Sequence, residues 1–162
     1  MKRKLCTIVT KFCVFLFTEN CALLFTDYNV CCAVIANGTK ILAVQRGPAS
    51  SHPFQWEFPG GKIHQEETAQ QCIVREIEEE LTIRIEVMNP LIPVEFNYGF
   101  RQIRLTGWIC KIASGEIRLT EHIAQQWFRF DEWDTLDWSG ADRELILKNQ
   151  EFFRAIVLGK QS

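Results

Sequence analysis

Three glutamates lie close together in the middle of the sequence, and their spacing suits metal chemistry. Glu76, Glu79 and Glu80 fall within a segment whose apolar pattern predicts an amphipathic helix. At about 3.6 residues per turn, these positions share one helix face. Carboxylates held this close repel one another unless a cation lies among them, and Mg²⁺ (or Mn²⁺ in its place) prefers oxygen ligands. The sequence therefore predicts a metal site with Glu76 and Glu80 as direct ligands and Glu79 as a ligand or a support for one.

A glycine-rich turn, Pro59-Gly60-Gly61-Lys62, comes shortly before the predicted helix. Glycine lets the backbone approach a ligand closely, so this turn could hold an anion. Within the helix, Arg75 would hold a carboxylate in place by bidentate hydrogen bonds. Glu67 could interact with Arg75 or complement the helix dipole. A metal ion beside an anion-binding turn is what the hydrolysis of a diphosphate requires.

The segment from Gly61 to Ile83 resembles the Nudix box, G-x5-E-x7-R-E-U-x-E-E-x-G-U, in which U is aliphatic. The one departure is Thr82, where the family has glycine. A β-branched residue disfavours positive φ, so either the helix ends differently or Thr82 is strained by roughly 1–2 kcal/mol. The other eight of the nine fixed positions match: Gly61, Glu67, Arg75, Glu76, Ile77, Glu79, Glu80 and Ile83.

The resemblance covers about residues 28–158, and Trp56–Lys62 is most similar to the MutT-like branch and its CTP-pyrophosphohydrolase relatives. It implies a Nudix-type α/β/α sandwich (an α/β, or α+β, fold) with a mixed central sheet, a loop-helix-loop and a C-terminal helix. It also implies an Mg²⁺-dependent enzyme that converts a nucleoside triphosphate to a monophosphate and diphosphate. The expected substrates are modified nucleotides such as 8-oxo-dGTP, or (d)CTP and 5-methyl-dCTP.

Two alternatives stay open at this point. The chain could be a Nudix hydrolase of another nucleoside diphosphate-X substrate, such as a dinucleotide or a sugar nucleotide. It could also be a non-catalytic nucleotide-binding module. Loss of box carboxylates would mark such a module, and none is lost here.

The resemblance assigns further site residues. Gly60 would offer its carbonyl to the metal ion. Glu121, in a loop before Trp127, matches a metal-binding or base glutamate and could deprotonate the attacking water, or could simply be solvated. Arg46 and Lys62 would contact phosphates, although Arg46 could be a surface residue and Lys62 could pair with a helix carboxylate. The expected catalytic residues are Arg75, Glu76, Glu79 and Glu121.

Three residues are candidates for base recognition. Phe58 could stack on a base or belong to the core. Arg101 matches an arginine with which MutT-like proteins contact the base. Asp142 stands where MutT itself has asparagine, as in the CTP-type relatives. An ionised Asp142 only accepts hydrogen bonds, which suits the amino group of cytosine, whereas a protonated Asp142 could read an oxidised purine. Asp142 could also be nothing more than first-turn helix charge.

The size and charge of the chain fit a single enzyme domain. A length of 162 residues allows one domain with a substantial core. The net charge of −2 gives no basic surface for a nucleic-acid polymer, so the expected partner is a small nucleotide. Seven cysteines without a C-x2-C pair favour free thiols in a reducing compartment, hence a cytoplasmic location. No membrane is expected as a partner, and the chain is expected to be a monomer or a homodimer.

Residues 1–27 differ from the rest of the chain. A basic Lys2-Arg3-Lys4 precedes an apolar stretch that is rich in cysteine and phenylalanine. Lys11, Glu19 and Asn20 interrupt this stretch, which is therefore too broken for a spanning helix. The interpretation is an N-terminal extension of uncertain status: a start placed too early, a signal or anchor, or a genuine added element. The Nudix-like domain is expected at 28–159.

Alternation and turn signals predict the elements of that domain. The Asn37-Gly38 pair predicts a hairpin. The stripe of Ala69, Ile73, Ile77 and Leu81 should face the core, and Ser139 is a good helix N-cap. The expected strands are 28–36, 40–46, 56–58, 82–88, 100–112, 116–119 and 127–130, and the expected helices are 67–81 and 141–158, the latter ended by Gly159.

Overall fold

The computed structural model describes residues 28–99 and 101–157. The predicted extension at 1–27 and the helix end at Gly159 lie outside the described residues. The strands are β1 Tyr28–Asn37, β2 Lys40–Gln45, β3 Trp56–Glu57, β4 Gly60–Lys62, β5 Arg84–Pro90, β6 Val94–Asn97, β7 Gln102–Ser114 and β8 Ala124–Arg129. The helices are α1 Ala69–Leu81, the short 3-10 helix η1 Phe130–Thr135, α2 Gly140–Lys148 and α3 Gln150–Val157.

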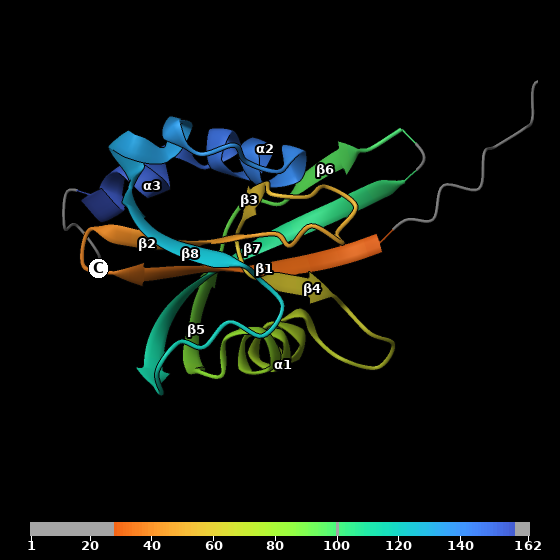
Figure 1. Cartoon of the computed structure of the whole chain (residues 1–162), viewed down its shortest axis with the longest axis horizontal. Helices are drawn as coiled ribbons and strands as arrows, with labels where there is room; N and C mark the ends of the chain where they lie inside the picture. Colours follow the sequence, from red (N-terminus) through yellow and green to blue (C-terminus); the bar gives the residue numbers. More distant parts are fainter. Residues whose placement is uncertain (1–27, 100, 158–162) are drawn as a thin grey trace, which may run out of the picture.

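The strands form one mixed sheet whose central order is β3-β2-β1-β7-β5, with β4, β6 and β8 paired alongside. β1 and β7 are parallel from Tyr28↔Ile103 to Ile35↔Cys110. The other named pairs are antiparallel, including the β1–β2 hairpin at Asn37↔Lys40. Figure 1 shows α2 and α3 on one side of the sheet and α1 on the other. The expected α/β/α sandwich is confirmed.

The central strand β1 supplies both cores. Successive side chains of a strand point to opposite faces, and every residue of the run Cys31–Ala36 is buried. Cys32, Val34 and Ala36 pack under α2 and α3, whereas Cys31, Ala33 and Ile35 pack against α1. A strand buried on both faces reads as a continuous apolar run, as this one does in the sequence.

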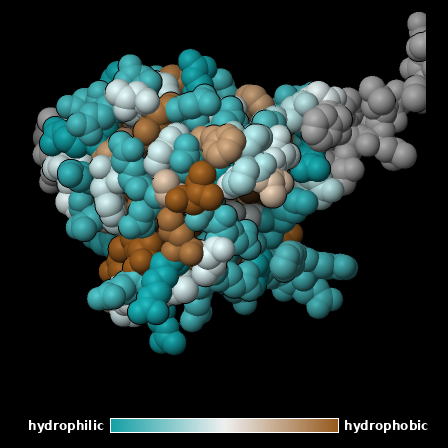
Figure 2. All heavy atoms as spheres, viewed as in Figure 1, coloured by the Kyte–Doolittle hydropathy of each residue, from teal (hydrophilic) through white to brown (hydrophobic). Residues whose placement is uncertain are grey.

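Apolar side chains are mostly withdrawn into these two cores. Figure 2 shows a largely hydrophilic face that is broken by a few apolar side chains. Among the described residues, the large hydrophobic side chains that remain exposed are Phe54, Val74, Ile92 and Ile123. Scattered exposure of this kind is ordinary for a folded domain.

Helix α1 begins at a capping box and ends in a left-handed residue. The hydroxyl of Thr68 accepts from the backbone N–H of Gln71, whose side chain accepts from Thr68 in return. Ile73, Ile77 and Leu81 are fully buried, as the stripe predicted. Thr82 follows at φ 58° and ψ 25°, so the strained alternative is the one observed. Its hydroxyl donates to the carbonyl of Glu116 at 3.3 Å, which offsets part of that strain.

Two predictions of secondary structure are wrong. Residues 116–119 form no strand, because Arg118 donates its backbone N–H to Leu81 at the end of α1. The closing helix is interrupted at Asn149, whose side chain bonds both the N–H and the carbonyl of Ile92.

Candidate active site

A cleft of about 470 Å³ opens on one edge of the sheet. Its walls come from β1, β3, β4, β7, α1 and α2, together with the loops that follow β2, precede β7 and precede β8. Of the predicted site residues, the cleft is lined by Arg46, Phe58, Gly60, Lys62, Glu76, Glu80, Arg101, Glu121 and Asp142. Arg75 and Glu79 lie outside this lining, on the neighbouring face of α1.

Helix α1 presents two carboxylates to the glycine turn. Glu80 is only 6% exposed, and its Oε2 accepts the backbone N–H of Gly60 at 3.0 Å. Glu76 lies against Gly61, where an added Cβ would approach Glu76 Oε1 to 2.3 Å. A side chain at position 61 would therefore displace the carboxylate of Glu76.

Negative charge is concentrated around Glu80. Burial, together with the charges of Glu57, Glu76 and Glu121, raises the pKa of Glu80 from 4.5 to about 9. As the side chains are arranged, no three acidic, histidine or cysteine groups among the described residues close around a metal position. The donor set nevertheless consists of closely spaced carboxylate oxygens, which are the ligands that a hard divalent cation prefers.

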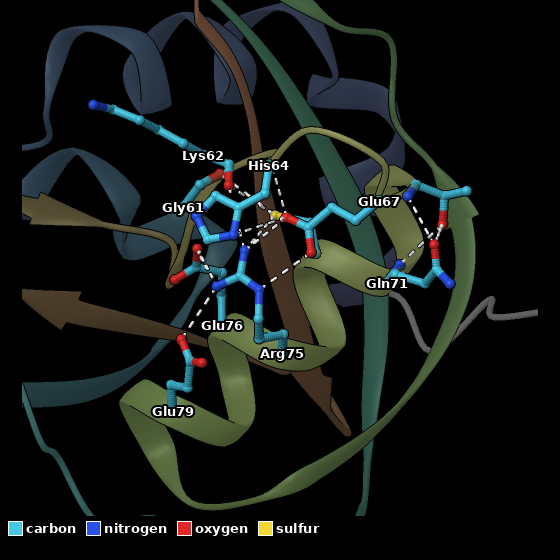
Figure 3. A network of polar contacts seen from close by, with 10 residues as sticks. Gly61, Lys62, His64, Glu67, Gln71, Arg75, Glu76 and Glu79 are labelled. Carbon is cyan, nitrogen blue, oxygen red and sulfur yellow. Dashed lines mark hydrogen bonds and ion pairs between the residues drawn. The ribbon is translucent and has the colours of Figure 1, made fainter.

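Arg75 binds the box carboxylates together, as Figure 3 shows. Its guanidinium donates to Glu67 at 2.8 and 3.2 Å, to Glu76 at 2.9 Å and to Glu79 at 3.1 Å. The bonds from Arg75 and from the N–H of His64 lower the pKa of Glu67 to about 2. Glu79 is held by this network with its side chain 59% exposed. The predicted cluster is thus divided, with Glu76 and Glu80 at the cleft and Glu79 beside Arg75.

Two residues that sequence reasoning missed complete the cleft. Glu57 accepts from Arg46 Nη1 at 2.9 Å and contacts His122 Nε2 at 3.1 Å. Both Glu57 and His122 border the cleft. Their only sequence signal is adjacency, since Glu57 precedes Phe58 and His122 follows Glu121. Arg46 therefore lies in the site and not on the open surface.

Asp142, on α2, is buried and also borders the cleft. It accepts from the backbone N–H of Phe58 at 3.1 Å and from the hydroxyl of Ser139. Burial raises the pKa of Asp142 to about 7, helped by the charge of Glu57. Ser139 occupies the N-cap position as predicted, but its hydroxyl bonds Asp142 and makes no capping bond.

Phe58 belongs to the core. It is 2% exposed and packs against Trp138 and Phe153, with ring centroids 4.9 and 6.0 Å apart. Its edge still borders the cleft.

The ring of Tyr28, which borders the cleft, contacts two cationic side chains. Lys62 Nζ lies 4.1 Å from the ring centroid of Tyr28, and the guanidinium carbon of Arg101 lies 5.2 Å from it. Cations over an aromatic face are held electrostatically. Lys62 is therefore directed to Tyr28 and away from Arg75 (Figure 3). All three residues line the cleft.

Comparison with known proteins agrees with this geometry. The chain matches the NUDIX domain family over residues 26–148. It is 35% identical over 99 residues to the CTP pyrophosphohydrolase of Escherichia coli (strain K12), covering 61% of this chain and 73% of that protein. It is 28% identical over 121 residues to the 8-oxo-dGTP diphosphatase of the same organism, covering 74% of this chain and 94% of that protein.

A solved structure shows the same fold. The solution structure of the E. coli ORF135 protein superimposes with a TM-score of 0.68 at 31% identity, over 81% of this chain and 93% of that one. The chain therefore belongs to the Nudix family of hydrolases. Within the described ranges, no helix is long and apolar enough to cross a membrane.

Proposed function

We propose that this Nudix hydrolase is a Mg²⁺-dependent nucleoside triphosphate pyrophosphohydrolase that produces a nucleoside monophosphate and diphosphate. The physiological substrates would be modified nucleotides of the 8-oxo-dGTP type, or (d)CTP and 5-methyl-dCTP. The observation that carries the proposal is the polarity of the cleft. Its lining brings together the carboxylates of Glu76, Glu80 and Glu121, the glycine turn, Arg46 and Asp142.

The residues that would hold the metal are Glu76, Glu80 and Glu121, with the carbonyl of Gly60. When bound, a divalent ion would neutralise phosphate charge and make a water more acidic. Arg75 would keep Glu76 oriented through the 2.9 Å bond. Glu79 pairs with the same arginine and does not line the cleft. Its role would be to support Glu76 through Arg75.

Hydrolysis needs a water, an acceptor for its proton and a leaving group. Water attacks a phosphorus of the phosphate chain of the nucleotide. The P–O–P bond breaks, and diphosphate leaves with the electron pair of that bond. The carboxylate of Glu121 would take the proton of the water. Arg46, and Lys62 at the rim, would stabilise the phosphate charge that develops during this step.

The base would lie toward Arg101 and Asp142. With a pKa near 7, Asp142 would be present in both protonation states at neutral pH. The ionised form accepts hydrogen bonds only, whereas the protonated form can also donate. This dual state supports two base classes, the amino group of a cytosine and an oxidised purine. Phe58 would contribute an edge contact from the core.

A nucleotide panel tests the proposal. We expect hydrolysis of at least one of dCTP, 5-methyl-dCTP, CTP and 8-oxo-dGTP with Mg²⁺, with monophosphate and diphosphate as products. Glu80→Gln should lower kcat by at least about 100-fold, since it removes a buried ligand. Activity on ADP-ribose or a dinucleotide without activity on triphosphates would overturn the substrate class. Full activity in both Glu79→Gln and Glu80→Gln would overturn the catalytic site and favour a binding module.

A further inference from the structure

The carboxylate of Glu57 is shared between two donors at the ends of neighbouring strands. Arg46 Nη1 approaches Oε2 at 2.9 Å, and His122 Nε2 approaches Oε1 at 3.1 Å. β2 lies between β3 and β8, with Val44 opposite Glu57 and Gln45 opposite Ala124. The sheet therefore delivers all three side chains to the same edge of the cleft.

His122 is built into this arrangement and is not a surface residue. Its side chain is 6% exposed. An ionised carboxylate only accepts hydrogen bonds, so the contact with Glu57 assigns the hydrogen of His122 to Nε2. Each oxygen of Glu57 thus has its own donor. Removal of either donor would leave the carboxylate free to turn.

The backbone on both sides is fixed independently of these side chains. Ile123 donates its N–H to Gln45 at 3.0 Å, and Arg46 donates to Gln55 at 2.9 Å. The backbone positions that carry the His122 and Arg46 side chains are therefore held close together by main-chain hydrogen bonds. These bonds do not set the direction of the Arg46 side chain, which is oriented by its hydrogen bond to Glu57.

One donor of the Arg46 guanidinium is buried without an acceptor in the described part of the chain. Its Nε is buried and has no hydrogen-bond partner among the described residues. A buried donor without an acceptor is unfavourable, so such a group calls for a water, an ion or a ligand atom as its acceptor. Because Arg46 lines the cleft, an anionic oxygen in the cleft would supply the missing acceptor.

We propose that His122 is a positioning residue for binding of the phosphate chain. By donating to Glu57, it fixes the carboxylate that orients Arg46, and Arg46 then presents Nε to a phosphate oxygen. This inference rests on the proposed function in one respect, namely that the cleft receives a phosphate chain. It does not depend on the base or on the metal ligands.

Two substitutions at position 122 distinguish whether His122 acts as a hydrogen-bond donor to Glu57 or only as a packed side chain. His122→Leu keeps similar bulk but removes the donor to Glu57. We expect it to raise KM for the preferred triphosphate about ten-fold, with kcat changed by less than about three-fold. His122→Gln restores an N–H near the place of Nε2 and should return KM to within about three-fold of the unmodified protein. A loss in kcat alone, or equal losses in both variants, would overturn the proposal.

A double-mutant cycle tests whether His122 acts through Arg46. If it does, His122→Leu should add less than about two-fold to KM in an Arg46→Met background. Arg104→Met is the matched control, because Arg104 pairs with Glu95 on the surface and is half-exposed. The effect of His122→Leu should stay at about ten-fold in that background. Multiplicative effects with Arg46→Met would refute action through the arginine.

Binding of inorganic triphosphate separates this inference from the proposed function. Calorimetry with inorganic triphosphate and Mg²⁺ reports the phosphate chain without a base or turnover. We expect about ten-fold weaker binding by His122→Leu and near-normal binding by His122→Gln. If the unmodified protein hydrolyses no triphosphate, the proposed function fails while this measurement still decides the role of His122. Should His122→Leu not fold, His122→Asn replaces it, since its amide nitrogen takes the place of Nδ1 and does not reach Glu57.

Discussion

Glu80 lies buried beside the cleft, bonded to the N–H of Gly60, and burial among other carboxylates raises its pKa to about 9. An acid with a raised folded-state pKa favours the protonated form of the folded protein. Its contribution to stability is therefore full below about pH 4.5 and is lost as the pH rises toward 9. Metal binding would offset this cost in the functional state.

A neutral replacement of Glu80 should stabilise the metal-free protein. With a chelator at pH 8, we expect Glu80→Gln to raise the free energy of unfolding by roughly 1–3 kcal/mol, and the difference should vanish near pH 4.5. With excess Mg²⁺ the order should reverse, because the unmodified protein gains a ligand. Thermal unfolding across pH, with chelator or Mg²⁺, measures both effects. Lower stability of Glu80→Gln at pH 8 with chelator would contradict this account.

Residue spacing revealed one half of the site and not the other. Glu76 and Glu80 could be assigned to one face because a helix repeats every 3.6 residues. Glu57 and His122 are separated by 65 positions and meet only through strand pairing. No local pattern encodes such a contact, so both residues were missed. The core position of Phe58 likewise depends on α2 and α3, which are distant in the sequence.

At the scale of the element, α1 is fixed at both ends by side chains of the Nudix box and its surroundings. Arg75 and Glu67 tie the preceding loop to the helix at 2.8 Å. Thr82 ends the helix in the left-handed region at φ 58°. The first contact stabilises the helix, whereas the second costs energy because Thr carries a Cβ.

Restoring glycine at the end of α1 should stabilise the protein. Thr82→Gly relieves the strain but loses the hydroxyl bond to Glu116, so we expect a net gain of about 0.5–1 kcal/mol. Thr82→Ala is the matched control, because it loses the same hydroxyl and keeps the Cβ. It should be no more stable than the unmodified protein. Urea denaturation compares the three, and equal stability of Gly and Ala variants would show that position 82 is unstrained.

The contribution of the Glu67 ion pair to stability should be lost in the acid range of pH. Since its pKa is lowered from 4.5 to about 2, its stabilisation is present above 4.5 and is lost as the pH falls toward 2. Glu67→Gln should therefore melt below the unmodified protein at pH 7, and the two should converge near pH 2. Glu78→Gln, at an exposed position of α1, should leave the melting curve unchanged. A difference in melting temperature that persists at pH 2 would show that Glu67 stabilises the protein through packing and not through charge.

The elements themselves were predictable where local signals are strong. The hairpin at Asn37-Gly38, the buried strand before it and the stripe of α1 all follow from turn chemistry and period. Residues 116–119 alternate like a strand, but the end of α1 takes their hydrogen bonds instead. The break at Asn149 depends on Ile92, which lies in another part of the chain. Tertiary contacts decided the outcome at both places.

At the scale of the whole molecule, the two cores share strands β1, β2 and β7 and should unfold together. Ile77 and Ile146 are fully buried on opposite sides of the sheet. We expect Ile77→Val and Ile146→Val each to cost about 0.5–1.5 kcal/mol. The double variant should be additive within about 0.5 kcal/mol, because the two sites share no partner.

Urea unfolding followed by tryptophan fluorescence and by far-ultraviolet circular dichroism checks this expectation. Coincident curves with one midpoint would support a single cooperative unit. A second transition seen with only one probe would mean that one helical layer separates from the sheet before the rest.

The position of Tyr28 has a practical consequence for handling the protein. Tyr28 opens the central strand β1 and also borders the cleft. A truncated chain that begins at Tyr28 would place its amino terminus, or a tag fused to it, beside the cleft that we propose to bind the nucleotide. An affinity tag is therefore better fused behind α3, whose described residues contribute nothing to the cleft wall.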